Sequence, residues 1–204
     1  MEARIAKIIS TVFNPLFIPT YGVMILFKLD TFIRYVLPTG AKNLVLIIVF
    51  INTAIAPFIA ILFMKKLGLI NNLSLNKRNE RIMPIIVGVF LYFFTYYILR
   101  QSSLPSIVHF YFLGATIVVT ISLFITIYWK ISLHMVSMGG LTGFLMATAF
   151  LLRTNTIFWI VVVIFSSGLV GSSRLLLNQH TSGQVFAGYI LGVSTMLILY
   201  LILR

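Results

Sequence analysis

Residues 107–128 read IVHFYFLGATIVVTISLFITIY, a run of 22 residues without Asp, Glu, Lys or Arg. At about 1.5 Å per residue, a helix of this length crosses a hydrocarbon core of roughly 30 Å. Six further apolar runs occupy residues 11–27, 44–64, 84–99, 131–152, 157–173 and 185–203. The runs are continuously apolar rather than alternating, which favours helices over the strands of a membrane barrel. We therefore predict an all-α polytopic integral membrane bundle with six or seven transmembrane helices.

The composition of the whole chain supports this class. Of 204 residues, 60% are hydrophobic and 9% are charged, against about 25% charged in soluble domains. That composition excludes a water-soluble globule, a nucleic-acid-binding module and a disordered tail. A net charge of +12 on so apolar a chain suits contact with anionic lipid head groups or phosphates.

The scarcity of acidic residues restricts the chemistry. The only carboxylates are Glu2, Asp30 and Glu80, and cysteine is absent. This excludes two-carboxylate acid–base catalysis, thiol nucleophiles and cysteine-ligated zinc. We predict a site that uses neither a metal ion nor another cofactor.

The chain is expected to form one membrane domain over residues 1–204. Its first apolar run follows Arg4 and Lys7 without a small-residue cleavage site, so we expect a retained helix, interrupted near Asn14 and Pro15. With seven crossings, the N-terminus and the connections 65–83, 129–131 and 174–184 share one side of the membrane. Lys and Arg are distributed too evenly between the two sides to fix the orientation.

Three histidines are candidates for chemistry. His109 follows a loop on the side opposite to the other two and is expected to be an interfacial residue. His134 follows Lys130 by four residues, so on a helix the two share a face. They are either a membrane-interface lysine beside a packed histidine or a functional pair, which ionisable groups in membrane segments often form.

The polar stretch from Ser173 to Val185 gives the sharpest signal. Arg174 has a fixed fork of donors suited to phosphate, and His180 is a candidate nucleophile. Gln184 lies four residues after His180, so its amide oxygen is positioned to accept from Nδ1–H and to aim Nε2 outward. The alternative is a polar interhelical loop with an anchoring arginine.

These stretches resemble the motifs of the type-2 phosphatidic acid phosphatase superfamily, the membrane relatives of the vanadium haloperoxidases. The third motif of that family reads S-R-x5-H-x3-D, and Ser173, Arg174 and His180 match it. The second, P-S-G-H, is matched loosely by residues 132–134, and the first, K-x6-R-P, in part by residues 77–84. The runs W-K-I-S-x-H at 129–134 and H-T-x-x-Q-V-x-A-G at 180–188 are similar to a multi-spanning prokaryotic branch of the family. The resemblance covers residues 76–192 and leaves residues 1–64 as N-terminal helices outside that core.

The chain departs from the family pattern in each of the three motifs. Gln184 stands where most members carry Asp, and a neutral amide orients the histidine without stabilising an imidazolium. Met83 replaces the arginine before Pro84, so Arg78 or Arg81 must supply that phosphate contact. Leu133 replaces the glycine before the histidine of the second motif.

The resemblance implies a metal-independent lipid phosphatase that hydrolyses a phosphomonoester or pyrophosphate through a phosphohistidine intermediate. His180 would attack phosphorus, and His134 would protonate the leaving oxygen and then activate water. Gln184 would orient His180. The phosphoryl oxygens would be held by a set of basic and hydroxyl side chains: Lys77, Arg78, Arg81, Lys130, Ser132 and Arg174. The implied location is the inner membrane of a prokaryotic cell, with membrane lipids and no nucleic acid as partners.

Two other classes of function stay open. A phosphotransferase of the same fold would pass the phosphoryl group to an alcohol, and a non-catalytic protein would bind or carry lipid phosphates. Phosphatidate, phosphatidylglycerol phosphate and isoprenyl phosphate or pyrophosphate all fit the pattern. The sequence does not select among these lipids, nor does it set the oligomeric state.

Overall fold

The computed structural model describes residues 1–72 and 78–203, and within these ranges every regular element is a helix. Six helical segments are long and apolar enough to cross a membrane, the first of them composite. The prediction of an all-helical chain with six or seven potential crossings is thereby confirmed. In chain order the helices are α1 (Glu2–Val12), α2 (Ile18–Lys28), α3 (Phe32–Val36), α4 (Thr39–Phe50), the π-helical turn η1 (Ile51–Ile55), α5 (Ala56–Lys66), α6 (Arg78–Arg100), α7 (Ser106–Tyr128), α8 (Leu133–Leu152), α9 (Ile157–Leu176) and α10 (Ser182–Leu203).

The first apolar run does not form a continuous crossing. It is divided into α1 and α2, as Asn14 and Pro15 predict, and α2 has 11 residues, about 16 Å of helix. The polar backbone groups at the break have partners. Leu16 N–H donates to the Asn14 side chain at 3.1 Å, and the Leu16 carbonyl accepts from Thr53 of η1 at 3.3 Å. Because these backbone groups are hydrogen-bonded within the protein, an irregular segment is tolerated inside an apolar bundle.

The helix formed by the short third apolar run extends beyond that run at its polar end. Residues 84–99 alone are too few for a full crossing, but α6 begins at Arg78 and reaches 23 residues. The polar start of this helix therefore carries Arg81 into the protein, where only 5% of its surface is exposed. Pro84 lies in the second turn of α6.

Helices α8 and α10 pack very closely through glycines. A Cβ atom on Gly143 would lie 2.8 Å from the Val193 carbonyl, and one on Gly188 would lie 2.8 Å from the Ser132 carbonyl. Gly139 and Gly192 face backbone of the partner helix in the same way. Small residues four apart are typical of tight helix pairs in membranes. Here they bring the N-terminal ends of α8 and α10 together, where Ser132 N–H donates to the Gln184 carbonyl at 3.4 Å.

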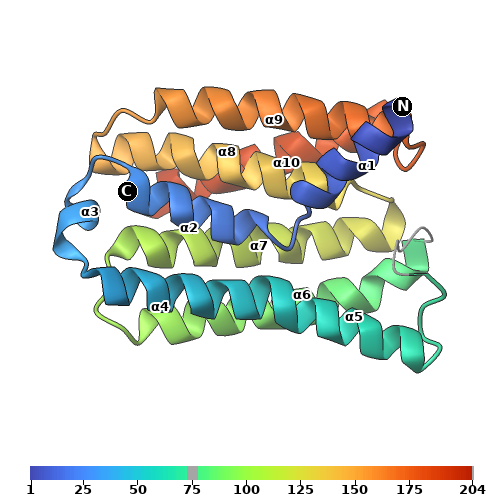
Figure 1. The fold of residues 1–204 in the computed structure, drawn as a ribbon, viewed down its shortest axis with the longest axis horizontal. Coiled ribbons are helices and arrows are strands. Elements are labelled where there is room, and N and C mark those ends of the chain that lie inside the picture. Colours follow the sequence, from blue (N-terminus) through green and yellow to red (C-terminus); the bar gives the residue numbers. More distant parts are fainter. Residues whose placement is uncertain (73–77, 204) are drawn as a thin grey trace.

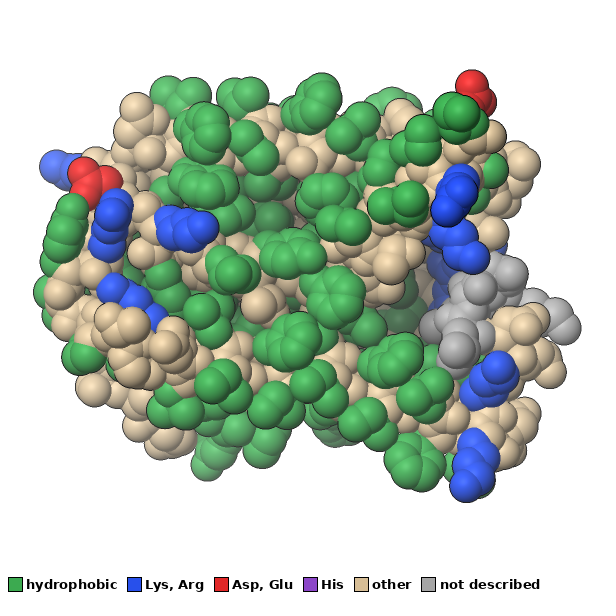
Figure 2. All heavy atoms as spheres, viewed as in Figure 1, with side chains coloured by type: hydrophobic (Ala, Val, Ile, Leu, Met, Phe, Trp, Pro, Cys, Tyr) green, Lys and Arg blue, Asp and Glu red, His purple; other side chains and the backbone are tan. Residues whose placement is uncertain are grey.

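The outer surface suits hydrocarbon. Large apolar side chains such as Phe90, Phe165 and Ile190 are more than half exposed, the reverse of a soluble protein. In Figure 2 hydrophobic side chains cover the middle of the visible face, and Lys and Arg gather toward its two ends. This distribution agrees with a multi-pass membrane protein whose long helices run between the two basic ends.

Candidate functional site

Three connections meet at one end of the bundle. Helix α5 ends and α6 begins at this end. The segments 129–132 and 177–181, which join α7 to α8 and α9 to α10, lie at the same end, where α1 begins (Figure 1). The order of apolar runs predicted this common side. The site residues therefore come from helix ends that are far apart in the sequence but adjacent in the fold.

His180 is held in one orientation by its neighbours. Its Nδ1 lies 2.9 Å from Oε1 of Gln184, and the Thr181 backbone N–H points to the same oxygen at 3.3 Å. Since an N–H donor already identifies that atom as the amide oxygen, Nδ1 must carry the hydrogen. The hydrogen bond expected between His180 and Gln184 is therefore present, and it leaves the lone pair on Nε2.

The Nε2 side of His180 faces a guanidinium. Arg81 Nη1 lies 3.5 Å from Nε2 and 3.5 Å from the Ile131 carbonyl oxygen. Burial and then the charge of Arg81 lower the pKa of His180 from its ordinary 6.5 to about 4, although the hydrogen bond to Gln184 acts in the opposite direction. At neutral pH the imidazole is therefore uncharged, which is the form that a nucleophile requires.

Three further donors at this end are buried without hydrogen-bond partners: Nε of Arg174, Oγ of Ser10, and Oγ of Ser132, whose residue is fully buried. Buried polar atoms are nearly always satisfied by protein, water or a ligand. Arg174 lines the same cavity as Arg81 and His180. The unsatisfied Nε therefore lies where an oxygen-bearing ligand would complete its bonding.

Lys130 adds a third positive charge near the two arginines. Its pKa is lowered by partial burial first and then by the charges of Arg81 and Arg174. Mutual repulsion among these cations favours a bound anion, whose charge would relieve it.

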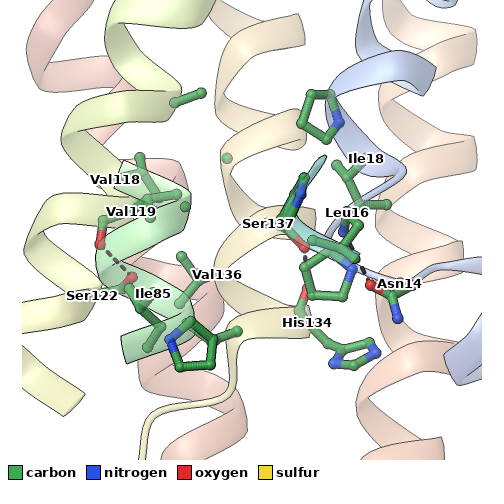
Figure 3. A pocket seen from close by; sticks show the side chains of 18 of the residues that line it. Asn14, Leu16, Ile18, Ile85, Val118, Val119, Ser122, His134, Val136 and Ser137 are labelled. Atoms are coloured by element: carbon green, nitrogen blue, oxygen red, sulfur yellow. Dashed lines mark hydrogen bonds between the residues drawn. The ribbon is translucent and has the colours of Figure 1, made fainter. Parts of the chain in front are cut away.

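His134 is held by helix α1. Its Nε2 lies 3.0 Å from the Ser10 carbonyl oxygen, 124 residues away in the sequence. A carbonyl oxygen only accepts, so Nε2 carries a hydrogen and the other ring nitrogen, Nδ1, is left for proton transfer. Figure 3 shows His134 and Asn14 among the residues that line the cavity, with Ser137 one turn along α8. His134 also lies within electrostatic range of His180 and Arg174.

Other residues that the sequence suggested lie outside this cluster. Arg78 is exposed and donates to the Tyr128 carbonyl at 2.7 Å, so Arg81 is the arginine of α6 that reaches His180. Lys77 lies outside the described residues. Glu80 accepts from the Asn71 side chain at 2.6 Å. His109 lies 3.0 Å from the Leu99 carbonyl, near the opposite end of the bundle.

The site also includes residues of α1 that the sequence analysis assigned to an N-terminal extension. Lys7, Ser10 and Thr11 of α1, and Asn14 of the break that follows it, line the cavity beside His134. They recur at spacings of three and four, the pattern of one helix face. That polar stripe, which leads into the first apolar run, is the signal that could have placed α1 at the site.

These residues form the polar end of one cavity of about 520 Å³. Arg81, Arg174, His134 and His180 lie at this end, and the remaining lining is mostly apolar side chains of α5 to α8. Sites for small molecules commonly occupy roughly 300–1,000 Å³ and combine an apolar wall with a few polar groups. The arrangement suits an amphiphile with an anionic head group.

Metal ligation finds little support among the described residues. No group of three or more His, Asp or Glu side chains is placed to hold a metal ion there. Asp30 instead accepts from Tyr35 at 2.9 Å on the connection beyond α2. The donors gathered at the cavity are cationic or neutral, which suits an anion rather than a cation.

Comparison with known proteins finds no match among family models, curated proteins or solved structures.

Proposed function

We propose that this protein is a membrane-bound lipid phosphate phosphatase that works through a phosphohistidine, without a metal ion. The geometry of His180 is the main support for this proposal. A neutral His180, with its Nδ1 hydrogen fixed by Gln184, turns Nε2 toward Arg81 at the cationic end of an otherwise apolar cavity. This constellation matches the chemistry that the motif resemblance implies.

The first step transfers the phosphoryl group to the protein. Nε2 of His180 forms a bond to phosphorus while the bond from phosphorus to the leaving oxygen breaks. His134 donates a proton from Nδ1 to that oxygen and keeps its Nε2 hydrogen on the Ser10 carbonyl. The incoming phosphate favours the charged imidazolium that this transfer needs, because an opposite charge nearby stabilises the ionised form.

The second step returns the protein to its starting state. His134, now neutral at Nδ1, takes a proton from water, whose oxygen attacks phosphorus as the bond to Nε2 of His180 breaks. Inorganic phosphate leaves and His180 is again neutral. His134 releases to solvent the proton that it took up when the lipid phosphate bound, so both histidines recover their initial protonation. Arg81 and Arg174 hold the phosphoryl oxygens and offset the charge that develops on them, with Lys130 nearby.

The proposed setting is the inner membrane of a prokaryotic cell, with the phosphate at the membrane interface. The polar end lies beside the helix ends, and the apolar part lies between the helices. A lipid phosphate has this same division between head and tail. Helices α6, α8 and α10 all begin at that end, and their partial positive charge adds to the attraction for an anion.

A phosphate-release panel tests the proposal. Purified protein in lipid nanodiscs is supplied with phosphatidate, phosphatidylglycerol phosphate, isoprenyl phosphate and isoprenyl pyrophosphate, each at equal mole fraction. We expect release from at least one lipid by the wild type and none above background by His180→Ala. A phosphatase reaction that survives in His180→Ala would overturn the assignment of the nucleophile.

A lipid-phosphate binder without turnover is the second candidate, and the neutral partner of His180 favours it. Gln184 offers no negative charge to stabilise an imidazolium. The same panel separates the two, since a binder retains the lipids but releases no phosphate from any of them. Adding glycerol as acceptor distinguishes a phosphotransferase, which would form glycerol phosphate.

A further inference from the structure

One face of α6 lines the cavity over about half of the length of the helix. Arg81, Ile85, Gly88 and Tyr92 follow one another at spacings of four, three and four residues, and all four line it. Eleven residues separate the first from the last, a distance of about 16 Å along the helix. The cationic end and Tyr92 are therefore the two ends of one elongated space.

Helix α7 repeats the pattern in the opposite direction. Ser122, Val118, Ala115 and Tyr111 line the same cavity, and α7 runs antiparallel to α6 and packs along it. Eleven residues again separate the first from the last, about 16 Å. In Figure 3 Ser122 and Ile85 lie at one level of this wall, with Val118 and Val119 one turn further along.

Buried, firmly packed aromatic rings line the far end of the cavity. Tyr92 and Tyr111 are 7% and 3% exposed, and Met196 beside them is 1% exposed. The Tyr111 hydroxyl donates to the Ile18 carbonyl at 3.4 Å, and its ring centroid lies 4.0 Å from that of Phe144. We call these packed side chains the floor of the cavity. They should move little when a ligand binds, because protein interiors resist compression.

Two glycines keep the middle of the cavity open. Gly88 and Gly140 both line it, and a Cβ atom on Gly140 would meet nothing within 4 Å. At Gly88 the nearest atom would be a Val119 methyl at 3.9 Å, an ordinary contact. The space beside these glycines is therefore large enough for a side chain, although the protein places none there.

We propose that this space binds one linear hydrocarbon chain of the substrate and limits its length at the floor formed by Tyr92 and Tyr111. The inference rests on the proposed function, because the cationic end fixes the phosphate and so fixes where the chain begins. An extended chain advances about 1.3 Å per carbon. A length of about 16 Å therefore holds roughly twelve carbons between the phosphate and the floor.

Gly88→Leu tests the proposal by filling the cavity partway. Gly88 lies seven residues from Arg81, about 10 Å, so the leucine should shorten the usable length to roughly eight carbons. Gly168→Leu is the matched control. Gly168 is exposed on α9, and a Cβ atom there meets nothing within 4 Å. Both variants add the same side chain to a helix.

The measurement is calorimetric binding of butyl-, octyl- and dodecylphosphonate to each protein in lipid nanodiscs. Partition into the bilayer is common to both variants, so the ratio of their dissociation constants isolates the cavity. We expect a ratio near one for butylphosphonate and at least about tenfold for dodecylphosphonate, since each buried methylene gains about fourfold relative to water. Equal ratios at all three lengths would overturn the proposal.

A second variant that fills the cavity, and phosphate release as a second measurement, separate failure of the chain site from failure of the proposed phosphatase. Gly140→Leu fills the same space from α8 and should show the same dependence on chain length if Gly88→Leu does not fold. Chain-dependent binding without phosphate release from any lipid would leave the chain site intact and refute the proposed phosphatase. Phosphate release with no chain-length difference between the variants and the control would refute the chain site alone.

Discussion

Replacing Gln184 by leucine removes the acceptor that fixes the nucleophile. In the wild type its Oε1 accepts from Nδ1 of His180 at 2.9 Å, so Nε2 keeps the lone pair. During phosphoryl transfer the imidazole becomes cationic and this hydrogen bond strengthens. Hydrogen bonds to charged groups contribute about 1.5–3 kcal/mol. A loss of this size predicts a decrease in kcat of about 10- to 100-fold.

The assay is steady-state phosphate release on the lipid that the panel selects. The cations that hold the phosphate are unchanged in Gln184→Leu, so KM should move by less than about threefold. Gln184→Glu keeps the reach of the side chain and adds a negative charge, and it should match or exceed the wild type. We expect Gln184→Asp, the residue typical of the family, to leave activity intact or raise it.

The pH dependence of these variants provides a second readout. A carboxylate beside Nδ1 stabilises the imidazolium and raises the pKa of His180, so the acid limb of the activity profile should move to higher pH in Gln184→Glu. Thermal unfolding of each variant serves as the control for folding. A Gln184→Leu protein with wild-type kcat and an unshifted profile would refute the orienting role of this residue.

Four further predictions concern the tautomers of the two histidines, the titration of His180, the helix packing and the metal. Nitrogen NMR should find opposite neutral tautomers, with the hydrogen on Nδ1 in His180 and on Nε2 in His134, and the same tautomer in both would contradict the hydrogen bonds described above. Burial lowers the folded-state pKa of His180 to about 4, so its NMR titration should have a midpoint near pH 4. The contribution of His180 to the free energy of unfolding should be lost as pH falls from about 6.5 toward 4. A titration midpoint near 6.5 would contradict the burial of this residue. Gly139→Leu should prevent correct packing of α8 on α10, because its Cβ would clash with the Tyr189 carbonyl, whereas Gly140→Ala should change the unfolding temperature little. Phosphate release should survive EDTA and be inhibited by vanadate, and loss of activity on chelation with recovery on adding magnesium would contradict a metal-independent mechanism.

The sequence by itself determined the helical class and the meeting of the connections. Uncharged runs of about 20 residues must satisfy their backbone within the membrane, and a helix does so locally. Alternation of the crossings then placed three distant connections on one side. The pair His180 and Gln184 also followed from the sequence, because a spacing of four residues places them within reach through local geometry alone.

Only the tertiary structure decided the partner of His134 and the choice among the arginines of α6. The Ser10 carbonyl meets His134 across 124 residues, and no local pattern encodes a contact that depends on how α1 folds back along the bundle. Arg78 and Arg81 are three residues apart, yet one is exposed and the other is buried beside His180. The packing of α6 decides which of them faces inward.

The cavity is likewise a product of packing. The sequence does not distinguish these glycines from one another. Gly88 and Gly140 face open space, whereas Gly139 and Gly143 face the backbone of α10. A glycine without a side chain suits either surrounding, so its residue type carries no information about which one it has. The distance and direction of the neighbouring helix distinguish a packing contact from the wall of a binding site, and these are fixed only when the whole bundle assembles.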